Sequence, residues 1–274
     1  MKKIMTVALF LVAALFGVQT ASAQSVEELW IESGSRRIYG VLGCPANDGQ
    51  RHPVAIVAHG FNGSHHFGRN YFEPLNALGY LCYTFDFPCG SLKNRSDNNT
   101  MQMSILDEQR DLEAIVRYFR SRQDVDTANI VLIGESQGGL VSALAASHLA
   151  EDVSQLVLVY PALCIPDNWN SRYPRLEDIP DTTRLWGVPM GRRFFEEVHT
   201  LHPFDVIGRF QKPVLIVQGD QDRIVSMDDS RRAVDLYNDA RLHIIKGAGH
   251  GFKGEALAEA LAVIKDFLQQ ERRR

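Results

Sequence analysis

Apolar runs of six to eight residues recur along the chain, and turn residues follow each of them. Within a run nearly every position is apolar, whereas a half-exposed strand would alternate apolar and polar residues. Such continuous runs are typical of parallel strands that are buried on both faces of a sheet. The strands predicted in this way cover residues 36–43, 54–59, 80–87, 130–135, 155–160, 213–218 and 241–246.

Between these strands the apolar positions recur at helical spacing. In residues 104–122, Ile105, Leu112 and Ile115 share one face, while acidic residues that include Glu108 and Asp111 take the other. Repeated alternation of strand and helix indicates an α/β fold, with a doubly wound and mostly parallel sheet in a single domain. Further helices are predicted at 69–78, 137–149, 228–238 and 255–270.

Residues 162–207 interrupt this alternation. We predict no strand here, and the segment is too long for an ordinary connection between two elements. It carries five prolines and is rich in Trp and Phe, whereas disordered segments are poor in aromatic residues. Since it precedes a strand whose carboxyl end would border the ligand crevice of an α/β sheet, we interpret it as a cap over that crevice.

The first 23 residues have the pattern of a secretory signal peptide. Two lysines precede the apolar stretch "IMTVALFLVAALFGV", and Ala21-Ser22-Ala23 supplies a small-x-small cleavage site. The alternative is an uncleaved membrane anchor, but the apolar stretch is shorter than the roughly 20 residues that span a bilayer. We therefore expect cleavage after Ala23, a folded domain at 24–274, and a secreted or periplasmic protein.

Charge and cysteine content exclude several function classes. Without Lys2 and Lys3 the chain carries 27 basic and 33 acidic side chains, a balance that repels nucleic acid and anionic membranes. The four cysteines are irregularly spaced, and Cys82 lies in an apolar run that suits a buried free thiol. We predict no disulfide and no metal, and we expect His65 and His66 to lie on a loop surface.

The stretch "IVLIGESQGG" (130–139) carries the first candidate chemistry. It matches G-x-S-x-G between a predicted strand and a predicted helix, which is the context that this motif requires. Ser136 would be exposed on a sharp turn as a nucleophile, and the backbone N–H of Gln137 would face an oxyanion formed there. The alternative is a turn whose glycines only let strand and helix pack closely.

A serine nucleophile needs a base and an acid, which follow it in the order expected for this motif. The stretch "VLIVQGDQDRIVS" offers Asp220 and Asp222 just beyond a buried strand. We choose Asp222 as the acid and interpret Asp220 as a turn residue. His250, in the glycine-rich "GAGHGF" after the next strand, would accept the proton of Ser136 and be oriented by Asp222.

The second oxyanion donor should come from the loop after an earlier strand. In "AIVAHGFNGS" the strand ends at His59-Gly60, which leaves the backbone N–H of Phe61 free to face the site. The alternative is a simple strand-ending turn.

Together, "HGFNGS", "GESQGG", "GDQDRIVS" and "GAGHGF" resemble the α/β-hydrolase superfamily, and more narrowly the bacterial cinnamoyl (feruloyl) esterases. The resemblance covers nearly the whole chain after residue 23. Carried over by motif, it implies Ser136, Asp222 and His250 as the triad and Phe61 and Gln137 as the oxyanion donors.

The same resemblance implies that the cap holds the phenolic ring of the substrate. Asp167 is the counterpart of an acid that binds the ring hydroxyl in that family. Phe194 and Phe195 lie near the position of a family tyrosine, and they can stack on a ring but not donate a hydrogen bond. Glu135 departs from the family, which commonly has His before the nucleophile, and the sequence suggests no role for it.

The leading hypothesis is a serine esterase that cleaves hydroxycinnamoyl esters through an acyl-enzyme, without a cofactor. Its partner would be a small aromatic ester or a feruloylated saccharide, with no nucleic acid and no membrane after signal cleavage. The sequence is compatible with a homodimer. A general short-chain acyl esterase, a serine peptidase of the prolyl-oligopeptidase type and a non-catalytic binding module are the alternatives.

Overall fold

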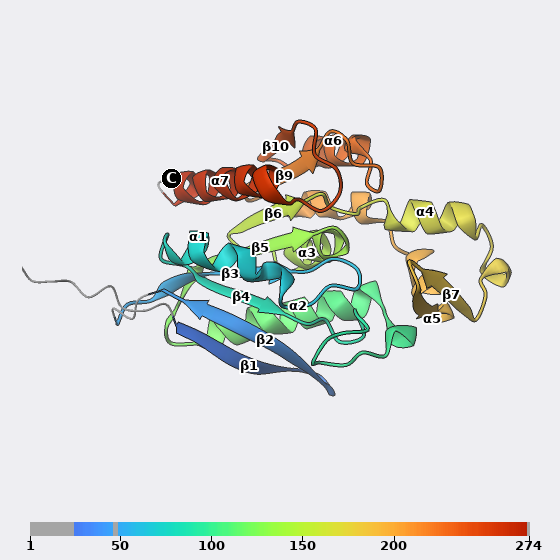
Figure 1. Ribbon diagram of the computed structural model, residues 1–274, viewed down its shortest axis with the longest axis horizontal. Helices are drawn as coiled ribbons and strands as arrows, with labels where there is room; N and C mark the ends of the chain where they lie inside the picture. The colour runs from blue at the N-terminus through green and yellow to red at the C-terminus, as the bar shows by residue number, and fades with distance from the viewer. Residues whose placement is uncertain (1–24, 46–48, 273–274) are drawn as a thin grey trace, which may run out of the picture.

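A computed structural model describes residues 25–45 and 49–272 of the protein (Figure 1). Its centre is an eight-stranded sheet in the order β1-β2-β4-β3-β5-β6-β9-β10. β1 is antiparallel to β2 and β2 to β4, and all the later neighbours are parallel. The prediction of a mostly parallel α/β sheet is confirmed. The strands are β1 (Ser25–Ser33), β2 (Arg36–Cys44), β3 (His52–Ala58), β4 (Leu81–Phe85), β5 (Val125–Glu135), β6 (Gln155–Val159), β9 (Val214–Gly219) and β10 (Ala240–Ile245).

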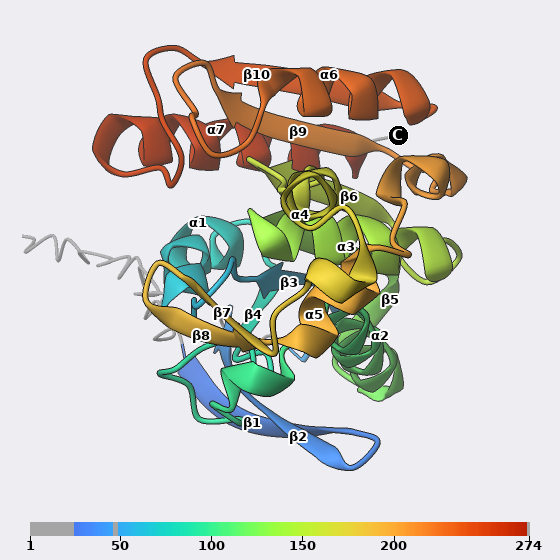
Figure 2. The same cartoon turned by 90° about the vertical axis from the view of Figure 1, so that its right-hand side faces the viewer.

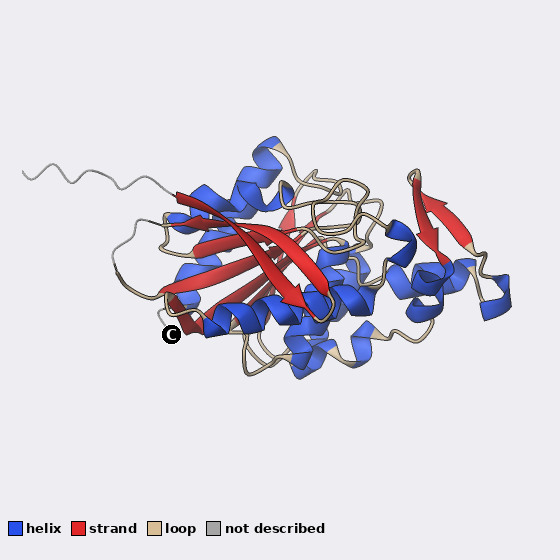
Figure 3. Ribbon diagram, turned by 90° about the horizontal axis from the view of Figure 1, so that it is seen from below, coloured by secondary structure: helices blue, strands red, loops and turns tan. Residues whose placement is uncertain are grey.

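Helices cover both faces of the sheet (Figure 3). In β3, Val54 and Ile56 pack with residues of α2, α3 and α6, whereas Ala55 and Val57 pack with residues of α1 and α7. Alternate side chains of one strand point to opposite faces, so an all-apolar run fills both layers of the core. The helices are α1 (Phe72–Asn76), α2 (Ile105–Ser121), α3 (Gln137–His148), α4 (Ile165–Arg172), α5 (Arg192–Val198), α6 (Met227–Leu236) and α7 (Gly254–Glu271).

Two elements in the first part of the chain differ from the prediction. Of the predicted helix at 69–78, Phe72–Asn76 is α-helical and Phe67–Tyr71 is a 3-10 helix. β1 was not predicted at all. It is an edge strand in which Leu29, Ile31 and Ser33 are buried and the first four residues are exposed. Only half of this strand therefore carries the alternation that marks a sheet face.

Of residues 162–207, the part up to Val198 lies beyond the carboxyl ends of the parallel strands, as Figures 1 and 2 show, whereas residues 203–207 run back along α3. They form α4, α5 and a hairpin of β7 (Thr182–Leu185) and β8 (Val188–Gly191). The prediction of no strand here was wrong. Trp186 and Gly187 have φ of 48° and 85°, which is the left-handed pair that closes a two-residue hairpin turn. The strands have four residues each, too few for a periodic signal.

Two acidic residues of α2 that we expected on the solvent face are buried. The Gln137 amide donates to both carboxyl oxygens of Glu108, at 3.0 and 2.9 Å. Asp111 accepts from the guanidinium of Arg36 at 2.8 Å. Partners supplied by other elements compensate the cost of burying these carboxyls, and the helical pattern alone does not reveal such partners.

His65 is buried, contrary to the expectation of a loop surface, whereas His66 is exposed. The backbone N–H and the ring Nδ1 of His65 both lie within hydrogen-bond distance of Asp86 Oδ1, at 2.6 and 2.8 Å. Its ring also packs edge-on against Tyr39. Asp86, directly after β4, therefore anchors this loop.

The predicted signal peptide, residues 1–23, lies outside the described residues. Within 25–45 and 49–272, no helix has the length and apolar character needed to span a bilayer. The four cysteines are free, and Cys82 is buried in β4.

Candidate active site

Ser136 stands on a sharp turn between β5 and α3. Its φ of 53° and ψ of −119° are conformations that a residue with a side chain rarely adopts. The turn is tight on every side. A Cβ on Gly134 would lie 2.3 Å from the carbonyl oxygen of Gly138, and one on Gly138 would lie 2.4 Å from that of Ala58. Glycine is required at both positions because neighbouring backbone occupies the space of a side chain.

The structure brings Ser136, His250 and Asp222 together from the ends of β5, β10 and β9. His250 Nε2 lies 3.0 Å from Ser136 Oγ, and His250 Nδ1 lies 2.8 Å from Asp222 Oδ2. With a proton on Nδ1, the imidazole donates to the carboxylate and its Nε2 is free to accept the serine proton. The arrangement can therefore turn the Ser136 hydroxyl into a nucleophile.

The environments of the two candidate acids differ. The Asp222 side chain is 1% exposed. Besides His250 it accepts from the backbone N–H groups of Ile224 and Val225, at 2.8 and 3.0 Å, and from the Gln218 amide at 3.0 Å. Asp220 is exposed and accepts from the Gly247 N–H at 2.6 Å, so it ties together the two loops instead.

The Gly60-Phe61 backbone runs directly beside Ser136. A Cβ on Gly60 would lie 3.0 Å from Ser136 Cβ. The buried His59 ring fixes this backbone, since its Nδ1 lies 2.7 Å from the Gly60 carbonyl and its Nε2 accepts from the Phe87 N–H at 3.1 Å. These two bonds require a neutral ring protonated on Nδ1, and burial lowers the pKa of His59 in the same sense.

The two predicted oxyanion donors both border this position. Phe61 and Gln137 line the same pocket as Ser136, and in the described ranges neither backbone N–H donates to another group of the protein. Gln137 is the first residue of α3, where backbone N–H groups lack partners within the helix and the helix dipole favours negative charge. The Gln137 side chain is held by Glu108.

Glu135, for which the sequence suggested no role, is buried beside the nucleophile. Its Oε1 accepts from the Tyr71 hydroxyl at 2.6 Å and its Oε2 from the Tyr160 hydroxyl at 2.8 Å. Burial raises the pKa of Glu135 to about 7, against the opposing effect of these two hydrogen bonds.

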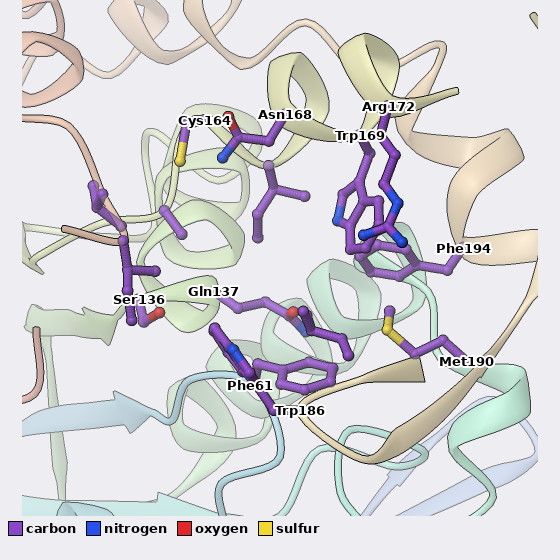
Figure 4. A pocket seen from close by; sticks show the side chains of 15 residues that line it. Phe61, Ser136, Gln137, Cys164, Asn168, Trp169, Arg172, Trp186, Met190 and Phe194 are labelled. Carbon is purple, nitrogen blue, oxygen red and sulfur yellow. The ribbon is translucent and has the colours of Figure 1, made fainter. Parts of the chain in front are cut away.

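A pocket of about 240 Å³ extends from Ser136 under the cap (Figure 4). Ser136 and Gln137 lie at one end of it, and Arg172, Met190 and Phe194 lie at the other. Its walls are mainly apolar and aromatic, and in the described part of the chain Arg172 is the one charged residue among them. The lining consists of Phe61, Ser136, Gln137, Ala162, Cys164, Ile165, Asn168, Trp169, Arg172, Leu185, Trp186, Met190, Phe194, Ile224 and Val225.

Of the three cap residues predicted to contact substrate, one lines the pocket. Phe194 does. Phe195 lies behind the wall, where its ring packs on Trp169 and Tyr173. Asp167 is exposed in the first turn of α4 and does not line the pocket, so its contact with the ring hydroxyl stays a prediction that the pocket lining does not support. Adjacent residues of a helix point about 100° apart, and it is Asn168 that faces inward.

The inward face of α4 carries the residues that the sequence reading missed. Ile165, Asn168, Trp169 and Arg172 all line the pocket. Their spacing of three, four and seven positions places them on one helical face. This spacing is visible in the sequence, but it identifies a pocket wall only once the segment is known to be helical. Trp186 was missed because the hairpin that presents it was not predicted.

A second pocket, of about 280 Å³, meets the first at Ser136. Phe61, Ser136, Trp186 and Ile224 line both of them. The Ser136 hydroxyl therefore lies where two pockets join, so that a bond it attacks could have one substituent in each. The residues that belong to the second pocket alone are Gly60, Gly63, Phe67, Glu135, Tyr160, His250 and Gly251.

Comparisons with known proteins agree with this fold. The model of the alpha/beta hydrolase fold family matches residues 53–196, just over half of the chain. No curated protein sequence matches. Est1E from Butyrivibrio proteoclasticus, solved with ferulic acid bound, is similar with a TM-score of 0.82 and 25% identity over 90% of this chain and all of that one. A dienelactone hydrolase from Anabaena variabilis, at 18% identity and a TM-score of 0.65 over 90% of this chain and 98% of that one, shares the fold.

Proposed function

Since the chain belongs to the alpha/beta hydrolase fold family, we propose that it is a serine esterase that hydrolyses hydroxycinnamoyl esters. One observation carries the proposal. His250 Nε2 lies 3.0 Å from Ser136 Oγ at the mouth of an aromatic pocket, and Asp222 holds the other ring nitrogen at 2.8 Å. The likeness to Est1E, whose structure contains ferulic acid, supports the choice of acyl group.

In the acylation step, Ser136 Oγ attacks the ester carbonyl carbon while its proton moves to His250 Nε2. The resulting tetrahedral oxyanion accepts hydrogen bonds from the backbone N–H groups of Phe61 and Gln137. The bond to the alcohol oxygen then breaks, and His250 returns the proton to that oxygen. Asp222 stabilises the imidazolium that exists between the two proton transfers.

In the deacylation step, His250 removes a proton from a water molecule that attacks the acyl-enzyme. A second oxyanion forms at the same two N–H groups. As it collapses, the bond between the acyl carbon and Ser136 Oγ breaks, His250 Nε2 returns its proton to Oγ, and the carboxylic acid is released. The scheme uses only groups of the chain and water, and it requires no cofactor.

The shape and lining of the pocket support an aromatic acyl group. Phe61, Trp169, Trp186 and Phe194 offer flat apolar surfaces on which a conjugated ring can pack edge-on or offset. Asn168 and Arg172 place amide and guanidinium donors on the same lining for oxygen substituents of the ring. The two joined pockets, of about 240 and 280 Å³, suit a small-molecule ester with acyl and alcohol parts.

The test compares kcat/KM for five substrates on the purified chain 24–274. We expect a higher kcat/KM for p-nitrophenyl ferulate than for p-nitrophenyl butyrate, which has the same activated leaving group. Methyl ferulate and methyl p-coumarate should be hydrolysed as well. A higher value for the butyrate would favour a general short-chain esterase. Cleavage of an Xaa-Pro anilide in preference to every ester would favour a peptidase.

We further propose that the protein acts outside the cytoplasm on small aromatic esters or feruloylated saccharides. The signal-like residues 1–23 support export, and they are tested by amino-terminal sequencing of the protein recovered from medium or periplasm. A mature chain that begins at Gln24 is expected. Retention of residues 1–23 would contradict the proposal.

A further inference from the structure

Glu135 and Tyr160 form a hydrogen-bonded pair directly beside the imidazole of His250. Glu135 is 3% exposed, and its carboxyl accepts from the Tyr160 hydroxyl at 2.8 Å. The Tyr160 ring lies against the His250 ring, with 4.7 Å between the centroids and 55° between the planes. The Phe252 ring packs edge-on against the Tyr160 ring, with 4.8 Å between the centroids.

The conformation of Tyr160 is strained, and several contacts hold it. Its φ of 37° lies in the left-handed region, which costs energy for a residue with a side chain. Its backbone N–H donates to the Val217 carbonyl at 2.8 Å, and its hydroxyl donates to Glu135. Strain of this kind persists only where the surroundings fix the residue, and here it places an aromatic ring against the candidate base.

Tyr71 provides an internal comparison. It donates to the other oxygen of the same carboxyl, at 2.6 Å, and it too is buried. In the described part of the chain, Tyr71 makes no hydrogen bond or ring contact with His250. The two tyrosines therefore make matched hydrogen bonds to Glu135 and differ in whether they touch the imidazole.

We propose that Glu135 is a positioning residue that acts through Tyr160 and fixes the orientation of the His250 ring. The proposal rests on the proposed function, in which His250 is the base. The titratable groups around Glu135 are the hydroxyls of Tyr71 and Tyr160, with the His250 ring and Asp222 beyond Tyr160.

Kinetics with methyl ferulate separate this role from a structural one. We expect Tyr160→Phe and Glu135→Gln each to lower kcat about tenfold with less than a twofold change in KM, and Tyr71→Phe to lower kcat less than twofold. The double variant E135Q/Y160F should also lower kcat by no more than about tenfold, because both changes remove the same hydrogen bond. Equal losses in Tyr71→Phe and Tyr160→Phe, or additive losses in the double variant, would overturn the proposal.

The pH profile gives a second readout. Since burial raises the pKa of Glu135 to about 7, this carboxyl takes up a proton as the pH falls through neutral, and a neutral carboxyl accepts a weaker hydrogen bond from Tyr160. We expect the acid limb of kcat/KM to show one ionisation more for the wild type than for Glu135→Gln. The same number in both would count against the proposal.

A measurement that needs no substrate keeps the two proposals distinguishable. The ring signals of His250 can be compared by NMR in wild type, Glu135→Gln and Tyr160→Phe. Loss of the bond between Tyr160 and Glu135 should shift or broaden these signals, because the tyrosine ring that lies against the imidazole is no longer held. Unchanged His250 signals in Glu135→Gln would refute the inference even if the chain hydrolyses ferulate, and changed ones would support it even if the true substrate is another ester.

Discussion

The substitution Asp222→Asn tests which acid orients His250. In the structure, Asp222 Oδ2 lies 2.8 Å from His250 Nδ1 and 3.0 Å from the Gln218 amide nitrogen. Oδ1 accepts from two backbone N–H groups, so it is the amide oxygen of an asparagine that would occupy that side. The amide NH₂ would then face His250 and require Nδ1 to accept.

An Nδ1 that accepts leaves the proton on Nε2, where the imidazole can no longer take the proton of Ser136. We expect kcat to fall about 10,000-fold, which corresponds to about 5.5 kcal/mol of activation free energy at about 1.36 kcal/mol per factor of ten. The burial of Asp222 makes escape to another rotamer costly, so little activity should be recovered through rearrangement.

The matched control is Asp220→Asn, two positions earlier. Asp220 is exposed, and its Oδ1 accepts from the Gly247 N–H, a bond that the amide oxygen of an asparagine can keep. We expect a loss of kcat below about tenfold. Both variants are assayed with methyl ferulate at saturation and checked by far-UV circular dichroism. If Asp220→Asn loses as much kcat as Asp222→Asn, or more, the assignment of the acid is refuted.

Five further substitutions test the rest of the site. Ser136→Ala should abolish ester hydrolysis without changing the far-UV circular dichroism spectrum, and near-normal turnover would eliminate Ser136 as the nucleophile. Phe194→Ala should raise KM for methyl ferulate more than for p-nitrophenyl acetate. Phe195→Ala, behind the pocket wall, should mainly lower Tm, through a loss of about 3–5 kcal/mol of stability. The opposite pattern would indicate that Phe195, and not Phe194, contacts the substrate. Gly138→Ala should prevent folding, because its Cβ would lie 2.4 Å from a backbone oxygen. The control Gly249→Ala, whose Cβ would lie 3.7 Å from its nearest neighbour, should express normally. A soluble and active Gly138→Ala variant would contradict the packing argument.

The sequence predicted the parts of the fold that repeat a strong local signal. Buried parallel strands are continuous apolar runs, and the ends of these strands held Ser136, Asp222 and His250, which the structure places within hydrogen-bond distance of one another. Their catalytic roles stay predictions until the substitutions above are measured. The roles of Gly134 and Gly138 in the turn at Ser136 could be interpreted because close backbone contact leaves few alternatives to glycine.

What the sequence could not predict depends on partners from distant elements. Glu108 reads as a surface residue of a helix until Gln137 is seen to donate to it. The buried carboxyl of Glu135 is hydrogen-bonded by two tyrosines that lie 64 and 25 positions away in the chain, and its proposed role depends on one of them. Asp167 was named from the family resemblance alone, and Asn168 was not considered. A difference of one residue changes which face of a helix a side chain occupies, and the bounds of the short helix after Cys164 are not visible in the pattern.

The division of the site between two parts of the chain has an evolutionary consequence. Ser136, Asp222 and His250 follow β5, β9 and β10, whereas most of the residues that enclose the pocket lie in the single connection between β6 and β9. Recombination or insertion within that one connection would change the lining of the pocket while leaving Ser136, Asp222 and His250 in place. Diversification of this lineage should therefore proceed by replacement of residues 162–195, and a transplanted segment from a relative should transfer that relative's preference in one step.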